Sequence, residues 1–255
     1  LPAASLAEQR LLERVGAAPN MRLACQLRPQ GNVSVMPLLP ANAQARDGYA
    51  QPAYLVGQER TVAVLFADLR SFTGIAERKL PYDLVFLLNS YFDTVGESIT
   101  SAGGMVDKFI GDGVMALFGI ETGPERGCRQ ALDAAKRMVE QVNTLSRSLA
   151  EELPEPLRIG IGIHCGPAVV GRMGYGETVH LTAIGDTVNV ASRLQDLTKE
   201  FGCQLVISDE VARSSGLDVA GLQRHEITVR NRNESLSIFV VDNVREMLER
   251  IKDKG

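Results

Sequence analysis

Hydrophobic residues follow two different spacings along the chain, and the two spacings alternate from about residue 60 onward. The run 61–66 is apolar and rich in β-branched residues, which predicts a buried strand. Apolar residues then recur at the spacing of one helix face, and Gly103-Gly104 end that helix. They are Leu84, Leu87, Leu88, Tyr91, Val95 and Ile99. A strand followed by an amphipathic helix indicates a layered fold.

The rest of the chain predicts further strands and helices of the same kind. The runs 105–110 and 114–118 flank an Asp-Gly pair, the strongest short signal for a hairpin. Helices are predicted over 125–149 and 186–201, with Asp186 as the N-cap of the second. Strands are predicted over 157–164, 179–184, 205–208, 226–229 and 236–241, and a glycine-rich turn over 166–176. This order predicts an α+β fold, in which helices flank a mixed, mainly antiparallel sheet.

The first quarter of the chain has a different texture. It holds six of the eleven prolines, which excludes long helices, although one short helix over 5–15 with Ser5 as its cap is compatible with the pattern. A polar stretch follows before the first predicted strand. We therefore expect four segments along the chain: 1–41, a linker over 42–59, the main domain over 60–245 and a tail over 246–255.

Composition narrows the class of protein. The chain is 45% hydrophobic and 23% charged, which excludes disorder and collagen, and its net charge of -4 provides no basic excess for a nucleic-acid partner. The four cysteines are scattered singly, unlike a zinc site or a disulfide framework. The sequence contains no apolar run that could span a bilayer and begins at Leu1 without a Met. We expect a cytoplasmic location without membrane contact, in a piece of a longer protein whose parent could be membrane-anchored.

Two aspartates stand where Mg²⁺ ligands would be expected. Asp68 follows the first buried strand and Asp112 lies in the hairpin turn, so the carboxylates share one crevice if these strands are neighbours. Mg²⁺ binds through one or two carboxylates together with substrate phosphate. Each residue also has an ordinary structural explanation, a helix cap for Asp68 and turn chemistry for Asp112.

Polar residues on two other segments could bind a nucleotide. Backbone N–H groups of the small polar turn 71–74 could hold a triphosphate. Asn189 and Arg193 are four residues apart on one helix, so they share a face and could contact a ribose and a phosphate. An exposed polar stripe explains this pair equally, and Lys108 could be a solvated lysine of an edge strand.

Three segments together carry a family resemblance. They read FADLRSFT at 66–73, GMVDKFIGDG at 104–113 and IGDTVNVASRL at 184–194. In order and spacing they closely resemble the catalytic domain of the class III nucleotidyl cyclases, over about residues 60–242. The resemblance implies a ferredoxin-like βαββαβ core and an enzyme that converts a nucleoside triphosphate into its 3′,5′-cyclic monophosphate and pyrophosphate.

The resemblance also implies roles for individual residues. Two Mg²⁺ or Mn²⁺ ions would bind to Asp68, Asp112 and the backbone carbonyl of Leu69. Asn189 matches the residue that orients the ribose, and Arg193 matches the arginine that stabilises the transition state at the α-phosphate. The remaining matched residues would bind the substrate phosphates; they are Phe72, Thr73 and Arg172.

The base-selecting positions favour ATP. Lys108 stands where adenylyl cyclases have Lys and guanylyl cyclases have Glu, because a cation can donate to adenine N1. Its partner position holds Thr182 instead of the common Asp, which resembles class IIIb and implies bicarbonate as an activator. Ser237 stands where mammalian enzymes place a phosphate-binding lysine, and the sequence leaves open whether Arg230 or Arg232 replaces it.

The family builds each site from two subunits. The resemblance therefore implies a head-to-tail homodimer, in which Asp68, Asp112 and Arg172 face the other residues across the interface. Two alternatives remain: a guanylyl cyclase, which Lys108 disfavours, and a catalytically inactive module that only dimerises or binds nucleotide. An inactive copy would be expected to lack at least one of the motif residues.

A second resemblance concerns the first forty residues. The segment NMRLACQ at 20–26 resembles the C-terminal end of a plant-type [2Fe–2S] ferredoxin, in which Cys25 would be the fourth cluster ligand. The other three ligands are absent from this chain, so a cluster is expected only in a longer parent. The alternative is a coincidental cysteine in a proline-rich leader.

Overall fold

The computed structural model divides the chain into two compact units, Leu1–Gln58 and Glu59–Gly255. Each unit is described by itself. The residues that the structure describes are 4–14, 22–23, 57–70, 72–76, 79–175, 179–228 and 235–247.

The first unit contains one described helix, α1 (Leu6–Arg14). The backbone N–H of Glu8 donates to Ser5 Oγ at 3.2 Å, so the predicted cap is confirmed. The Glu8 carboxylate accepts from Arg22 and from the backbone N–H of Leu23, and these bonds lower its pKa to about 2. Cys25 lies outside the described residues, so the ferredoxin remnant and the four-segment division stay predictions.

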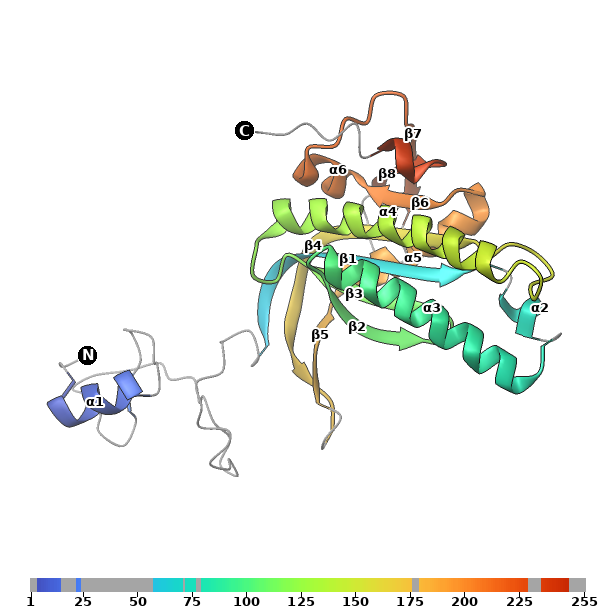
Figure 1. The fold of residues 1–255 in the computed structure, drawn as a ribbon. Helices are drawn as coiled ribbons and strands as arrows, with labels where there is room; N and C mark the ends of the chain where they lie inside the picture. Colours follow the sequence, from blue (N-terminus) through green and yellow to red (C-terminus); the bar gives the residue numbers. More distant parts are fainter. Residues whose placement is uncertain are drawn as a thin grey trace. The chain divides into compact units, whose positions relative to one another are not determined.

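The second unit is built on an eight-stranded sheet (Figure 1). The strands are β1 (Gln58–Leu69), β2 (Met105–Ile110), β3 (Gly113–Phe118), β4 (Ile159–Met173), β5 (His180–Ile184), β6 (Leu205–Ser208), β7 (Gln223–Thr228) and β8 (Ser235–Val241). Their order is β2-β3-β1-β4-β6-β8-β7, with β5 paired to β4. The β4–β6 pair is parallel, whereas the pairs β1–β3, β2–β3, β4–β5, β6–β8 and β7–β8 are antiparallel. The predicted mixed, mainly antiparallel sheet is confirmed.

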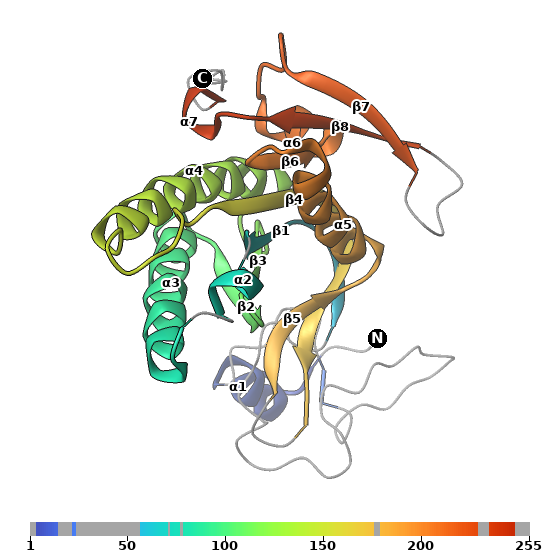
Figure 2. The ribbon, with the colours of Figure 1, turned by 90° about the vertical axis from the view of Figure 1, so that its right-hand side faces the viewer.

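Helices cover both faces of this sheet (Figure 2). They are α2 (Phe72–Ala76), α3 (Pro81–Ser101), α4 (Pro124–Ser148), α5 (Asp186–Phe201), α6 (Asp209–Ser215) and α7 (Val244–Met247). Along β1, Ala63 and Leu65 join the core beneath α3 and α4, whereas Val62 and Val64 join a second cluster with Ala191 of α5. Because strand side chains alternate, this parity directs Asp68 to the α5 side of the sheet.

The predicted glycine-rich turn over 166–176 is wrong, because β4 continues to Met173. The glycines of this strand serve helix packing instead. A Cβ on Gly162 would collide with the backbone N of Gln195 in α5, and one on Gly166 would lie 2.7 Å from Thr187 Oγ1. Glycine therefore allows α5 to lie directly on β4.

Smaller differences concern the ends of elements. The hairpin turn consists of Gly111 and Asp112, with the positive φ of 62° at Gly111, and Gly113 already begins β3. Asp186 is the first residue of α5 and not its cap, since Gly185 occupies the N-cap position without a side-chain bond. The polar turn after Asp68 contains the short helix α2, and α6 was not predicted.

Candidate active site

The structure brings Asp68 and Asp112 together. The β1–β3 register pairs Ala67 with Val114, so Asp68 lies beside the hairpin turn that carries Asp112. A Cβ on Gly113 would lie at an ordinary van der Waals distance of 3.5 Å from Asp68 Oδ1, which places the Asp68 carboxylate at the start of β3. Partial burial, and then the charge of Asp68, raise the pKa of the Asp112 carboxyl to about 6. Lys199 Nζ of α5 lies 3.1 Å from Asp68 Oδ2.

This carboxylate pair fits a divalent metal. Two negative groups that disfavour each other's ionisation would be stabilised by a cation between them. Leu69 ends β1 directly after Asp68, so its backbone carbonyl is adjacent in sequence to the first carboxylate. Among the described residues no group of three or more His, Cys, Asp or Glu side chains forms another candidate metal site.

Two residues to which the motifs assign no role lie in the same region as this carboxylate pair. Tyr91 of α3 is fully buried, and burial followed by the charges of Asp68 and Asp112 raises the pKa of its hydroxyl. Arg70 donates to the carbonyl oxygens of Thr198 at 2.6 Å and Cys203 at 2.5 Å. Arg70 therefore binds the C-terminal end of α5 to the end of β1, next to the contact between Lys199 and Asp68.

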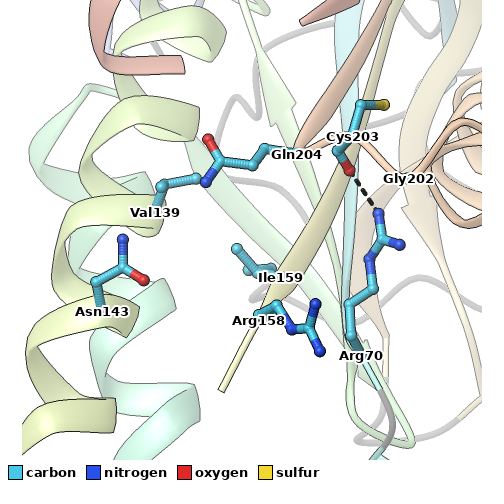
Figure 3. Close-up of a pocket in the computed structure, with 8 residues that line it drawn as sticks. All are labelled: Arg70, Val139, Asn143, Arg158, Ile159, Gly202, Cys203 and Gln204. Atoms are coloured by element: carbon cyan, nitrogen blue, oxygen red, sulfur yellow. Dashed lines mark hydrogen bonds between the residues drawn. The ribbon is translucent and has the colours of Figure 1, made fainter. Parts of the chain in front are cut away.

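Figure 3 shows the pocket around Arg70. Arg158 and Gly202 also line it, and the Arg70 guanidinium reaches the Cys203 carbonyl across it. Burial lowers the pKa of Arg70, a cost that the two carbonyl bonds offset. Because Arg70 is engaged with the backbone, it supports the position of α5.

Lys108 and Thr182, the base-selecting pair suggested by the motifs, meet in the structure. Lys108 Nζ donates to Thr182 Oγ1 at 3.1 Å, and Thr182 Oγ1 donates to Asp107 Oδ2 at 2.6 Å. Lys108 Nζ also lies 3.4 Å from Asp107 Oδ2, and His180 Nε2 lies 3.8 Å from Asp107 Oδ1. The three side chains of residues 107, 108 and 182 form one connected group, which we call the Lys108 cluster.

A β-bulge makes this cluster possible. The β2–β3 register pairs Val106 with Ala116 and Lys108 with Met115, so Asp107 is the extra residue of a bulge. In a regular strand, consecutive side chains point to opposite faces. The bulge instead lets Asp107 and Lys108 contact the same hydroxyl.

Asn189 and Arg193 lie on α5, as predicted. Within the described part of this protomer, neither side chain is bonded to Asp68 or Asp112. Both side chains are exposed, and Arg193 Nη2 donates to Glu200 Oε1 at 2.9 Å. Asn189 precedes Lys199, which touches Asp68, by about 15 Å of helix rise. One protomer therefore holds the carboxylates and Asn189 at separate places.

The predicted phosphate-binding residues are dispersed. Arg172 is exposed near the end of β4, where Nη2 donates to the Val179 carbonyl at 3.4 Å. Phe72 begins α2 and packs against the main core, while Thr73 follows it in the same helix.

The position of the missing lysine has a neighbouring cation. Ser237 of β8 faces Glu226 of β7, and Arg224 Nη2 donates to Ser237 Oγ at 2.6 Å. Arg230 and Arg232 lie outside the described residues, so the choice between them stays open. The sequence did not single out Arg224, because pairing across β7 and β8 alone places it beside Ser237.

Among the helices that the structure describes, none combines the length and the apolar character needed to cross a bilayer.

Comparisons with known proteins agree with this geometry. The family model described as "Adenylate and Guanylate cyclase catalytic domain" matches residues 56–242. An adenylate cyclase of Anabaena cylindrica is 34% identical over 190 residues, which are 71% of this chain and 37% of that protein. Adenylate cyclase 1 of Rhizobium meliloti is 35% identical over 187 residues, 72% of this chain and 28% of that protein. The chain thus spans about a third of the length of these relatives.

Solved structures lead to the same family. The guanylyl cyclase Cya2 superposes with a TM-score of 0.65 at 28% identity, covering 72% of this chain and 93% of that one. The adenylyl cyclase CyaB from P. aeruginosa superposes with a TM-score of 0.63 at 28% identity, covering 73% and 96%. The matched region contains the carboxylate pair, the Lys108 cluster and α5. The chain therefore belongs to the family of class III adenylate and guanylate cyclase catalytic domains.

Proposed function

We propose that this domain is an adenylyl cyclase that converts ATP into 3′,5′-cyclic AMP and pyrophosphate. In this reaction the ribose 3′-oxygen bonds to the α-phosphorus, the bond from that phosphorus to the β-phosphate oxygen breaks, and the hydroxyl proton is released. The observation that carries the choice of ATP is the bond from Lys108 Nζ to Thr182 Oγ1, which sets a donor beside an acceptor. Adenine presents the complementary N1 acceptor and amino donor.

The chain's own residues would divide the work as follows. Asp68 and Asp112, with the Leu69 carbonyl, would hold two divalent ions. When bound, Mg²⁺ or Mn²⁺ supplies Lewis-acid chemistry that activates a hydroxyl and stabilises phosphoryl charge. Asn189 would orient the ribose, and Arg193 would release Glu200 to neutralise charge at the α-phosphate.

Binding of the triphosphate would involve the remaining matched residues. Arg172 is exposed and could pair with the terminal phosphates, since its contact in the protomer is one long bond to a carbonyl. Phe72 and Thr73 follow the carboxylate Asp68 by four and five residues along the chain, where their backbone could contact the same phosphates. We assign these residues to substrate binding.

We further propose that two copies share each site. The separation of Asn189 from the contact between Lys199 and Asp68 along α5 argues against a complete site in one protomer. Exposed apolar side chains on β2, β4 and β5 provide a surface for a second copy to cover; they are Phe109, Ile110, Val169 and Ile184. A head-to-tail homodimer would hold two equivalent sites.

The activity is tested by cyclisation assays with ATP and GTP side by side, each with Mn²⁺ and with Mg²⁺. We expect cyclic AMP as the main product. The guanylyl alternative draws on the similarity to Cya2, and faster conversion of GTP would establish it in place of our proposal. Absence of any cyclic product would favour the inactive binding module. Bicarbonate, added at constant pH, tests the predicted activation.

The shared site is tested by mixing two inactive variants, Asp68→Ala and Asn189→Ala. Random association gives heterodimers with one intact site, so about a quarter of the wild-type activity should return. The matched control mixes Asp68→Ala with Asp112→Ala, whose lesions fall in the same half and leave no intact site. Equal activity in the two mixtures would contradict the shared-site arrangement.

A further inference from the structure

Asp107 is a buried charge for which the motifs assign no role. Its side chain has 0% exposure, and its Oδ2 accepts from Thr182 Oγ1 at 2.6 Å. Among the described residues its Oδ1 accepts no hydrogen bond. Burying a carboxylate is costly unless it is paired, so this buried side chain requires a compensating interaction. The short bond to Thr182 and the ammonium of Lys108 provide it.

We propose that Asp107 is a positioning residue that fixes the direction of the Thr182 hydroxyl and thereby selects adenine over guanine. This inference rests on the proposed adenylyl cyclase function. It adds a residue outside the Lys108–Thr182 pair to the determinants of base specificity.

The hydroxyl of Thr182 has a limited hydrogen-bonding capacity. A hydroxyl has one proton to donate and two lone pairs that accept. An ionised carboxylate only accepts, so the bond between Asp107 and Thr182 consumes the single Thr182 proton. Thr182 can then act only as an acceptor toward any further partner, as its bond from Lys108 already illustrates.

This polarity determines which base fits. Adenine presents an acceptor at N1 and a donor at its amino group, which match Lys108 as donor and Thr182 as acceptor. Guanine presents a donor at N1 and an acceptor at O6, and a freely rotating hydroxyl could turn its proton toward O6. With Asp107 in place, that rotation would break a charge-assisted bond at 2.6 Å.

The bulge in β2 provides the structural basis. Asp107 occupies the extra position between Val106 and Lys108, where the register shifts against β3. Thr182 is 4% exposed on β5, so its hydroxyl has few alternatives to the carboxylate. Two strands, β2 and β5, thus hold the direction of one hydroxyl without requiring any contact from Asp107 to the substrate.

The test replaces the carboxylate by an apolar side chain of similar size, Asp107→Leu. We expect the ATP-to-GTP ratio of kcat/KM to fall at least tenfold. The same fall should appear in the ratio of dissociation constants for 3′-deoxy-ATP and 3′-deoxy-GTP, which cannot cyclise. Asp93→Leu, which removes an exposed carboxylate from α3, should leave both ratios unchanged.

A double-mutant cycle separates positioning from a general structural role. In the Thr182→Val background the hydroxyl is absent, so Asp107→Leu should change the ratio no further. Asp107→Asn retains one acceptor oxygen and should lose less discrimination than Asp107→Leu. If Asp107→Leu does not fold, as judged by thermal unfolding, Asp107→Asn carries the test with an expected two- to threefold fall that vanishes in the Thr182→Val background.

The results distinguish this inference from the proposed function. A wild-type protein that prefers GTP or forms no cyclic product would remove the function and the inference with it. A wild-type protein that prefers ATP, together with folded Asp107 variants of unchanged preference, would overturn the inference alone. Equal effects of the Asp107 substitution with and without the Thr182 hydroxyl would overturn it as well.

Discussion

The two aspartates of the β2–β3 hairpin have opposite surroundings. At the turn, Asp112 faces Asp68, and partial burial and the neighbouring charge raise its pKa to about 6. At the bulge, Asp107 faces a hydroxyl and the ammonium of Lys108. Asp112 and Asp68 disfavour each other's ionisation, which a bound cation would relieve. Asp107 is already paired with Thr182 and Lys108 within the protomer. The hairpin thus combines a carboxylate that we propose as a metal ligand with one that is already paired within the protomer.

The largest expected effect concerns the turn. Asp112→Asn removes one of the two carboxylates proposed as metal ligands, so cyclase activity should fall by about 100-fold or more. Initial rates over a range of Mn²⁺ concentrations measure it. Asp133→Asn, on the far helix α4, is the matched control and should retain wild-type rates. Full activity of Asp112→Asn would remove this residue from the metal site.

The next effect concerns the bulge side. Lys108→Glu replaces the donor toward adenine N1 by an acceptor, so that two acceptors, the carboxylate and adenine N1, face each other. The ATP-to-GTP ratio of kcat/KM should fall by about 10- to 100-fold, the cost of one or two unpaired buried polar groups. Parallel assays with both nucleotides measure it. A ratio that stays at the wild-type value would place base selection elsewhere.

The free energy of unfolding should distinguish substitutions of Asp107 from those of Asp112 most clearly. Asp107→Leu leaves the buried Thr182 hydroxyl without its acceptor and should lower the free energy of unfolding by about 1–3 kcal/mol. Asp112→Asn relieves repulsion with Asp68 and should leave the free energy of unfolding unchanged or higher. Urea unfolding in the absence of divalent metal compares the two. Similar losses from both substitutions would contradict the difference in surroundings.

The smallest effect concerns Lys199, whose ammonium competes with a metal for Asp68. The side chain is 53% exposed, so solvent screens the contact, and such pairs are worth about 0–1 kcal/mol. Lys199→Met should therefore tighten Mn²⁺ binding by no more than about fivefold. Calorimetric titration measures it, with Lys136→Met on α4 as the control. Weaker Mn²⁺ binding would mean that Lys199 supports the ion and does not compete with it.

Much of the site could be predicted because its chemistry is carried by short segments. Asp68 is the next-to-last residue of β1 and Asp112 lies in a hairpin turn, and both positions follow from local hydrophobic runs. The helix 186–201 has the bounds that its apolar spacing predicted, so Asn189 and Arg193 share an element as expected. The local hydrophobic pattern is sufficient to predict a helix or strand whose own residues determine where it begins and ends.

Other features depend on neighbours that the local pattern does not contain. The glycines of β4 suggested a turn because the sequence does not reveal that α5 lies on them. Regular alternation along β2 would place Asp107 and Lys108 on opposite faces of the sheet. The bulge that lets both contact Thr182 is visible only in the register of β2 against β3. Arg70 likewise follows a strand without any signal that it caps a helix far along the chain.

The sequence by itself determined the order of the elements, the family motifs and the candidate metal and nucleotide residues, since these depend on local periodicity and on residue chemistry. Only the tertiary structure decided how those residues are paired. It placed Lys199 against Asp68 and directed the hydroxyl hydrogen bond of Thr182 to Asp107. Such contacts join side chains from strands and helices distant in sequence, and the packing of the sheet against α5, together with one bulge, brings them within bonding distance.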